Sequence, residues 1–254
     1  MTEAAPPRLF VPDDLAGSAP LALSPEHSHY LLHVMRRGAG DGVLLFNGRD
    51  GEWLGRIEAT QKRGATLRVE RRTRAQSGLP DLWLLFAPIK RQRIDFIAEK
   101  ATELGCAVIQ PVITRRTHVE RVNIERLRAH AIEAAEQCGL LAVPELRAPI
   151  DLGPLLDGWP AERRILFCDE SGQAPTVKSA LAGAVRGPWA VLIGPEGGFD
   201  VAEQNMLRAH AATLSVSLGP RIMRADTAAI AALALWQAFL GDWDAPPEPW
   251  QDAI

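Results

Sequence analysis

The chain has 254 residues, of which 47% are hydrophobic and 23% charged, a composition typical of a globular protein with ample material for a buried core. No stretch approaches the roughly 18 apolar residues of a membrane helix, and residues 1–7 lack the basic and apolar regions of a signal peptide, so we expect neither a membrane partner nor export. The net charge of −3 argues mildly against a nucleic-acid partner, but it hides an asymmetry along the chain.

The asymmetry separates a basic first half from an acidic second half. Residues 1–130 hold 20 Lys and Arg against 15 Asp and Glu, whereas residues 131–254 hold 8 against 16. Because phosphate binding depends on local potential rather than on total charge, the first half is compatible with RNA binding. A solvated surface of mixed charge with a chance imbalance explains the same counts equally well.

The three cysteines, Cys106, Cys138 and Cys168, are odd in number and include no CxxC pair. This usage indicates neither a disulfide framework nor a thiolate zinc site. We therefore expect three buried thiols in a protein of the reducing cytoplasm, and no metal site.

Residues 1–74 predict a small, barrel-like β domain. The strands are expected at residues 43–46, 53–59 and 66–70. Asn47-Gly48 and Asp50-Gly51 are turn dipeptides that tolerate positive φ, which predicts a hairpin between the first two strands. One helix interrupts the strands, with Ser24 as its N-cap and Arg37 near its end.

A short polar segment with Gly and Pro, residues 75–81, predicts a linker, after which strands alternate with helices. The expected strands are 82–87, 108–113, 165–168, 190–193 and 214–218. The expected helices are 92–104, 123–138, 200–210 and 227–240, and Asp200 with Glu203 forms a capping-box pattern for the third. The alternation predicts an α/β domain over residues 82–254, with a mostly parallel sheet covered by helices on both faces.

Ligands of open α/β sheets bind beyond the carboxyl ends of strands, and the loop Ile193-Gly-Pro-Glu-Gly-Gly-Phe199 follows such an end. Its adjacent glycines would let a ligand approach the backbone closely, and exposed amides can bind polar groups. Glu196 places a carboxylate at the mouth of the loop. A tight turn before the next helix is the alternative.

A second strand end is followed by Leu218-Gly-Pro-Arg-Ile-Met-Arg-Ala-Asp-Thr-Ala228. Arg221 and Arg224 place two permanent cations there, which could pair with phosphate or stabilise an anionic base. Asp226 or Thr227 is expected to cap the helix that follows. Alternatively, both arginines form salt bridges with surface carboxylates.

The third strand end, Phe167-Cys-Asp-Glu170, offers carboxylates that could hold a ribose hydroxyl or could simply face solvent. The sequence carries no P-loop, HExxH or GxSxG motif. Gly38-Ala-Gly-Asp-Gly42 lacks the GxGxxG spacing, and it lies between a helix and a strand, so an NAD enzyme is the least favoured class.

With these loops, the sequence resembles the RsmE family of 16S ribosomal RNA uridine-1498 N3-methyltransferases, which have the SPOUT fold. Its paired loops 193–198 and 218–228 carry the most specific part of the resemblance. The other matching segments are Lys90–Gly105, Arg115-Arg116, Glu133–Gly139 with Val143-Pro144, Arg8–Val11, His29–Arg36 and Gly40–Gly42. The resemblance therefore covers nearly the whole chain.

The resemblance implies a PUA-like RNA-binding domain at residues 1–74 and a SPOUT methyltransferase domain with a C-terminal trefoil knot at residues 82–254. It also implies S-adenosylmethionine as cofactor, with 16S ribosomal RNA of the small subunit as substrate. A homodimer whose active sites are completed across the interface is expected as well.

The resemblance further suggests which residues bind cofactor and RNA. The cofactor-binding residues are expected to be Phe167, Cys168, Asp169, Ile193, Gly194, Pro195, Glu196, Gly197, Gly198, Leu218, Gly219, Ile222, Met223, Arg224 and Thr227. The RNA-binding residues are expected to be Arg8, Arg36, Arg37, Arg71, Arg72, Arg74, Lys90, Arg91, Arg93, Arg115 and Arg116. Two positions depart from the family pattern: Asp226 replaces the usual Glu, and Leu140 replaces the usual Arg.

The chemistry of the implied reaction assigns three catalytic candidates. Uridine N3 is protonated at neutral pH, and loss of its proton spreads negative charge onto O2 and O4. Arg224 is the candidate to stabilise that charge, because arginine stays protonated. Glu196 or Asp226 is the candidate to accept the proton, directly or through water. The target base must be unpaired or flipped out, since pairing occupies N3.

Two other functions remain open at this stage. A non-enzymatic RNA-binding or ribosome-assembly factor would share the basic first half, but it gives no reason for the two glycine-containing strand ends. A related knotted methyltransferase that modifies a ribose 2′-hydroxyl or another base would use the same loops.

Overall fold

The computed structural model describes residues 5–61, 64–119 and 121–246, which form two compact units. The first unit contains the residues up to Gly78 together with Ala135–Val143, and the second contains Leu79–Ala134 and the residues from Pro144 to Pro246. The division after Gly78 falls inside the predicted linker. No pattern in the sequence predicted that residues 135–143 would join the first unit.

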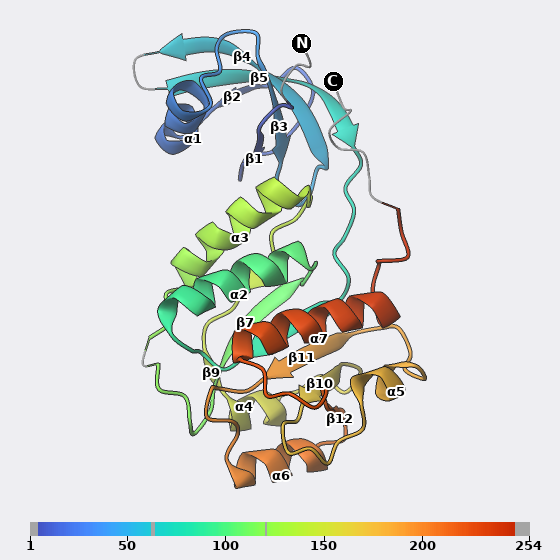
Figure 1. The fold of residues 1–254 in the computed structure, drawn as a ribbon. Coiled ribbons are helices and arrows are strands. Elements are labelled where there is room, and N and C mark those ends of the chain that lie inside the picture. Colours follow the sequence, from blue (N-terminus) through green and yellow to red (C-terminus); the bar gives the residue numbers. More distant parts are fainter. Residues whose placement is uncertain (1–4, 62–63, 120, 247–254) are drawn as a thin grey trace. The chain divides into compact units, whose positions relative to one another are not determined.

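The first unit is built on a five-stranded sheet with the order β1-β3-β4-β5-β2 (Figure 1). Its strands are β1 (Arg8–Phe10), β2 (Pro20–Ala22), β3 (Gly42–Phe46), β4 (Glu52–Gln61) and β5 (Gly64–Arg74). The predicted hairpin is β3–β4, which is antiparallel and opens the meander that β5 continues. β1 and β2 were not predicted, because three residues are too few to show an alternating pattern.

The predicted helix of the first unit is shorter than expected. Helix α1 (Pro25–His29) begins as predicted, with Ser24 Oγ accepting a hydrogen bond from the amide of His27 at 3.1 Å. It continues as one π-helical turn, η1 (Tyr30–Val34), and the prediction that it reaches Arg37 is wrong. Arg36 adopts φ +53°, a left-handed conformation that no helix can include.

A buried ion cluster fixes residues 135–143 to the first unit. Glu52 is fully buried and accepts from Arg8 at 2.8 Å and from Arg74 at 2.9 Å. The same guanidinium groups donate to main-chain carbonyls: Arg8 to Ala135 and Leu140, and Arg74 to Gly139. Carbonyls at the end of helix α3 (Ile124–Cys138), which have no partner within the helix, are thereby satisfied.

The cluster corrects one expectation and shifts one pKa. The Arg8 side chain is 1% exposed, so its burial contradicts the predicted contact with RNA. Burial alone would raise the pKa of Glu52, but hydrogen bonds from Arg74 and Arg8 hold that pKa below its ordinary value.

The second unit has a parallel sheet with the order β12-β10-β11-β6-β7-β8, and β9 pairs with the far end of β7. Its strands are β6 (Leu82–Phe86), β7 (Val108–Ile113), β8 (Glu145–Leu146), β9 (Ile150–Asp151), β10 (Arg164–Cys168), β11 (Trp189–Ile193) and β12 (Thr213–Val216). Every pairing in this sheet is parallel, which confirms the predicted α/β class.

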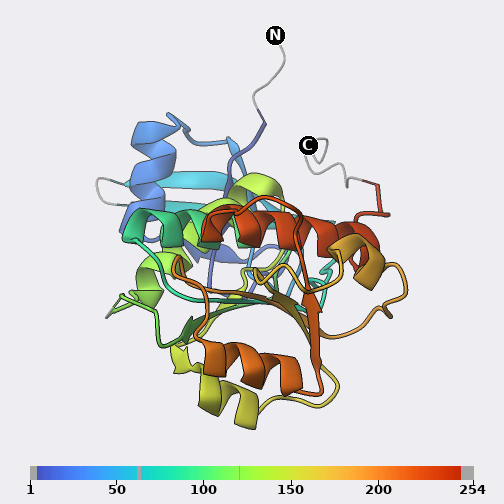
Figure 2. The ribbon, with the colours of Figure 1, turned by 60° about the horizontal axis from the view of Figure 1, so that its bottom comes forward.

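Helices cover both faces of this sheet (Figures 1 and 2). They are α2 (Arg91–Glu103), α3, α4 (Leu152–Asp157), α5 (Val177–Leu181), α6 (Val201–Ala209) and α7 (Ala225–Leu240). One core contains Ile97 of α2, Leu181 of α5 and Leu233 of α7, and the core on the opposite face contains Leu155 of α4 and Leu207 of α6. The sheet is thus closed off from solvent on both sides, as its apolar strands require.

The termini of two helices test the capping predictions. Asp200 and Glu203 form the predicted capping box of α6. Helix α7 begins at Ala225, with Arg224 in the N-cap position and no side-chain hydrogen bond to the helix, so the predicted cap by Asp226 or Thr227 is wrong. Asp226 Oδ1 instead accepts from the Thr227 amide at 2.8 Å.

The structure tests two expectations drawn from the composition, the burial of the cysteines and the absence of a membrane-spanning helix. Cys106 is a buried residue, whereas the residues Cys138 and Cys168 are partly exposed, so the expectation of three buried cysteines is met in full only at Cys106. None of the described helices combines the length and apolar character that a membrane span needs.

Replacing Glu52 by Gln should weaken the first unit strongly. The change leaves Arg8 buried without its counter-charge, which we expect to lower the free energy of opening of the β3–β4–β5 amides by about 3 kcal/mol. Hydrogen exchange followed by mass spectrometry measures this. Because the native pKa of Glu52 lies below 4.5, its stabilisation is present above pH 4.5 and lost as the pH falls through the native pKa.

The matched control is Glu70→Gln, which breaks the exposed Arg56–Glu70 pair of the same sheet. A surface pair contributes at most about 1 kcal/mol, so this variant should behave nearly as wild type. Equal losses for the two variants would show that the Glu52 cluster has no special role in stability.

Candidate active site

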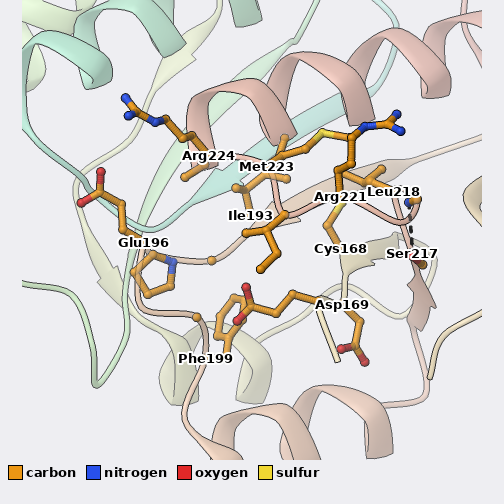
Figure 3. A pocket seen from close by; sticks show the side chains of 18 of the residues that line it. Cys168, Asp169, Ile193, Glu196, Phe199, Ser217, Leu218, Arg221, Met223 and Arg224 are labelled. Carbon is orange, nitrogen blue, oxygen red and sulfur yellow. Dashed lines mark hydrogen bonds between the residues drawn. The ribbon is translucent and has the colours of Figure 1, made fainter. Parts of the chain in front are cut away.

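The loops that follow β10, β11 and β12 meet in one cavity of about 540 Å³ (Figure 3). These strands are neighbours, with β10 between the other two, so their carboxyl ends lie together at one edge of the sheet. Helix α7 supplies Ala225 and Ala228 to the lining, and α2 supplies Arg93. The volume is in the range of small-molecule sites.

The glycine loop after β11 has no space for a side chain at two positions. A Cβ on Gly194 would lie 2.6 Å from the ring of Phe199, which packs edge-on against Phe167. Gly198 has φ +67°, and a Cβ there would overlap the carboxylate of Glu170. The backbone therefore lies close to the cavity in a conformation that other residues would not permit.

Two arginines in the connection after β7 hold this loop from outside the cavity. The amide of Arg115 donates to Glu203 Oε1 at 2.8 Å, and its guanidinium pairs with Asp200 at 3.1 Å. The guanidinium of Arg116 donates to the carbonyl of Gly197 at 2.7 Å. Both side chains remain largely exposed, so their predicted contacts with RNA stay predictions.

The two candidate proton acceptors share one partner. Arg93 of α2 forms an ion pair with Glu196 at 2.8 Å, and its Nε lies 3.7 Å from Asp226. Arg93 was predicted as an RNA contact from its place in the chain. The structure places it at the cavity, where its one positive charge is shared between the two carboxylates.

Arg221 and Arg224 lie at different ends of the cavity as drawn in Figure 3. Both are exposed, and neither forms a salt bridge or hydrogen bond with any residue in the described part of the chain. The alternative that they pair with surface carboxylates is therefore wrong. Two permanent cations without counter-ions border the cavity, where an anionic ligand group could bind.

At the third strand end, the carboxylate of Asp169 is fully engaged. Arg208 donates to both of its oxygens at 2.9 and 3.1 Å, and the amide of Ser171 donates at 2.9 Å. Burial alone would raise the pKa of Asp169, but the bonds from Arg208 and Ser171 lower it below its ordinary value. Beside it, burial raises the pKa of the Cys168 thiol to about 12.

Most predicted cofactor-binding residues line the cavity. They are Cys168, Asp169, Ile193, Gly194, Pro195, Glu196, Gly198, Leu218, Gly219, Ile222, Met223 and Arg224. Three others are absent from the lining: Phe167 is buried in the sheet, the carbonyl of Gly197 is bound by Arg116, and Thr227 is exposed on α7. The functional roles of all these residues stay predictions.

The lining also contains residues outside the predicted cofactor-binding set. They are Arg93, Glu170, Gly172, Phe199, Ser217, Pro220, Arg221, Ala225 and Ala228. Most of them already belong to the three strand-end segments that the sequence singled out, and Gly172 and Ser217 lie one or two residues outside those segments. Arg93 had been predicted as an RNA contact.

The remaining predicted RNA contacts differ in exposure. Arg36, Arg71, Arg72 and Lys90 are exposed, whereas Arg74 is 13% exposed and bound to Glu52. Arg37 is partly buried and donates to the carbonyl of Ala5 at 3.1 Å. The prediction for Arg91 concerns a side chain outside those that the structure describes. Leu140 is partly buried and packs against the cluster that contains Phe46.

Comparison with protein families gives two matches along this chain. Residues 76–237 match an RNA methyltransferase domain, and residues 23–70 match an RNA methyltransferase PUA domain. The first match covers more than half of the chain, and it includes every loop of the cavity.

Individual relatives are similar over nearly their full lengths. Ribosomal RNA small subunit methyltransferase E of Rickettsia conorii is 33% identical, covering 89% of this chain and 93% of its own. A structure of the enzyme of that name from Neisseria gonorrhoeae, bound to S-adenosyl methionine, has a TM-score of 0.84 at 27% identity, covering 92% and 98%. A putative methyltransferase of Legionella pneumophila with bound SAM has a TM-score of 0.83 at 32% identity, covering 93% and 99%.

Replacing Arg116 by Met should loosen the glycine loop. Methionine keeps an unbranched apolar stem but has no guanidinium to bond the Gly197 carbonyl, so we expect amide exchange across residues 194–200 to accelerate about tenfold, the equivalent of one charge-assisted hydrogen bond. Exchange mass spectrometry measures it. Arg121→Met is the control, since Arg121 is exposed on the same connection. Equal exchange in both variants would mean that Arg116 does not support the loop.

Proposed function

This chain belongs to the ribosomal RNA small subunit methyltransferase E family of RNA methyltransferases, and we propose that it methylates N3 of uridine 1498 in 16S ribosomal RNA with S-adenosylmethionine as donor. One observation carries the proposal: the glycine loop after β11 and the arginine-containing loop after β12 line the same cavity. A non-enzymatic RNA-binding protein would have no use for such a cavity.

The residues of the cavity fit S-adenosylmethionine. Ile193, Leu218 and Met223 offer apolar surface for an adenine ring, and Gly194 and Gly198 line the same cavity. When bound, this cofactor supplies an electrophilic methyl group carried on a positively charged sulfonium. The loops 194–198 and 218–223 would hold it through main-chain groups.

Arg224 is positioned to stabilise the anionic form of the acceptor base. Its guanidinium has no counter-ion among the described residues, so negative charge arriving on O2 or O4 of uridine would not have to displace a carboxylate. Arginine stays protonated at every physiological pH and cannot itself take the N3 proton. Arg224 therefore acts in this proposal as an electrostatic group only.

A carboxylate has to take that proton, and the candidates are Glu196 and Asp226. Arg93 pairs with Glu196 at 2.8 Å and lies 3.7 Å from Asp226, so one cation faces both candidates. The side chain of Asp226 is 17% exposed and that of Glu196 is 46% exposed. Asp226 is therefore the better shielded of the two from competing water.

The substrate is expected to bind along basic residues of both units. Arg36 and Arg72 of the first unit are exposed, as is Lys90 of the second. Such side chains position RNA by its phosphates and carry no sequence information of their own. The acceptor uridine must be unpaired or flipped out to present N3 in the cavity.

We extend the proposal to a homodimer, a trefoil knot and a cytoplasmic location. The dimer and the knot are both expected from the family to which the chain belongs. Ile222, whose apolar side chain is 99% exposed at the cavity, is a residue that a second copy could cover. A ribosomal substrate favours the cytoplasm.

Incubation with small subunits that lack the modification tests the function. With labelled S-adenosylmethionine, the wild-type protein should place one methyl group on N3 of uridine 1498, mapped by mass spectrometry. Arg224→Ala should lower the rate of transfer at saturating cofactor by roughly a hundredfold, as expected for loss of one group that stabilises developing charge. Cofactor affinity, measured by calorimetry, should change by less than about threefold.

Arg224→Lys is the matched control, because it keeps the charge but not the planar group. It should recover part of the lost rate. Label on another nucleotide or on a ribose would contradict the assigned specificity, and near-normal turnover by Arg224→Ala would remove Arg224 from the mechanism.

A salt titration tests the RNA contacts of the first unit. Arg36→Ala combined with Arg72→Ala should reduce the slope of log affinity against log salt by about one to two, because each lost phosphate contact removes about 0.7 to 0.9. Arg186→Ala is the control, since Arg186 is exposed in the acidic half and pairs with Asp244. A slope equal to wild type in the double variant would mean that RNA binds elsewhere.

A further inference from the structure

Two neighbouring carboxylates at the end of β10 have different surroundings. Asp169 has a side chain that is only 3% exposed, and both of its oxygens already accept hydrogen bonds. Glu170 lines the cavity and is exposed, and within the described part of the chain its carboxylate has neither a hydrogen bond nor an ion pair. Only Glu170 is therefore available to a ligand.

The glycine loop makes room for the Glu170 carboxylate. A Cβ on Gly198 would overlap Oε1 of Glu170 and would lie 2.9 Å from its Cδ. Gly198 also has φ +67°, a left-handed backbone conformation that by itself disfavours any residue other than glycine. The carboxylate thus reaches over the loop that is expected to hold the cofactor.

We propose that Glu170, and not Asp169, accepts hydrogen bonds from the vicinal ribose hydroxyls of the bound cofactor. The inference rests on the proposed function, because it takes the cavity as the S-adenosylmethionine site. A carboxylate has two acceptor oxygens, which match two neighbouring hydroxyl donors. In other nucleotide sites a carboxylate in an α/β domain likewise binds a ribose hydroxyl.

The amino-acid end of the cofactor suits Glu170 less well. That end carries an ammonium and a carboxylate side by side, so its site needs groups of both signs. Glu170 has no cation within ion-pair distance among the described residues. A hydroxyl pair needs acceptors only, which is what Glu170 offers.

Calorimetry with ligands that differ by one group tests the assignment. The probes are S-adenosylhomocysteine, 5′-methylthioadenosine, which lacks the amino-acid part, and the 2′-deoxy form of methylthioadenosine. Glu170→Gln should weaken the first two by a similar factor, roughly tenfold, as expected for hydrogen bonds to a charged acceptor. Removing the 2′-hydroxyl should weaken binding to wild type but make little further difference to the variant.

Glu162→Gln is the matched control, because Glu162 is an exposed carboxylate of the second unit that does not line the cavity. Its affinity for methylthioadenosine and its melting temperature should both stay close to wild type, with affinity changing by less than about threefold. Glu170→Gln should melt as wild type, since its carboxylate has no partner to lose.

Three results would overturn the assignment. Unchanged affinity of Glu170→Gln for methylthioadenosine and S-adenosylhomocysteine would mean that Glu170 does not touch the cofactor. A loss confined to S-adenosylhomocysteine would place Glu170 against the ammonium. If the wild-type protein bound none of these probes, the proposed cofactor itself would be wrong, and the role of Glu170 would fall with it.

Discussion

The parallel order of β12, β10 and β11 is the constraint on which the rest of the second unit depends. The register pairs Phe167 with Leu192 and Cys168 with Val216, so these strands end at nearly the same level. Three loops that are far apart in the sequence therefore leave the sheet side by side. Main-chain hydrogen bonding between the strands brings these loops to one edge of the sheet, and side chains such as Arg116 then fix the glycine loop there.

Sequence reasoning worked where the chemistry was local. Glycine-containing strand ends, the capping box at Asp200 and the alternation of strands and helices are each written in a few neighbouring residues. It failed where a partner came from elsewhere in the chain. The start of α7 was misplaced because Arg224 occupies the cap position without capping, and β1 was missed because its pairing with β3 is visible only in three dimensions.

The arginines show this limit most clearly, because a guanidinium looks the same in any sequence context. Arg8 is buried against Glu52, Arg116 supports the glycine loop, and Arg224 has no partner among the described residues. All three were predicted to contact ligand or RNA. What separates them is the supply of carboxylates and carbonyls within about 3 Å, which depends on the tertiary fold.

The charge balance of the cavity follows from the same differences. Arg93 pairs with Glu196 and lies 3.7 Å from Asp226, and one guanidinium cannot offset both negative charges. Arg221 and Arg224 remain without a partner among the described residues, and so does the carboxylate of Glu170 in the same lining. If the acceptor base reacted in its neutral form and kept its proton, an unpaired cation in the site would not lower the energy of the reaction. A site that must lower the energy of a base anion gains most when the cation is in place and unpaired beforehand, because no ion pair has to be broken during the reaction.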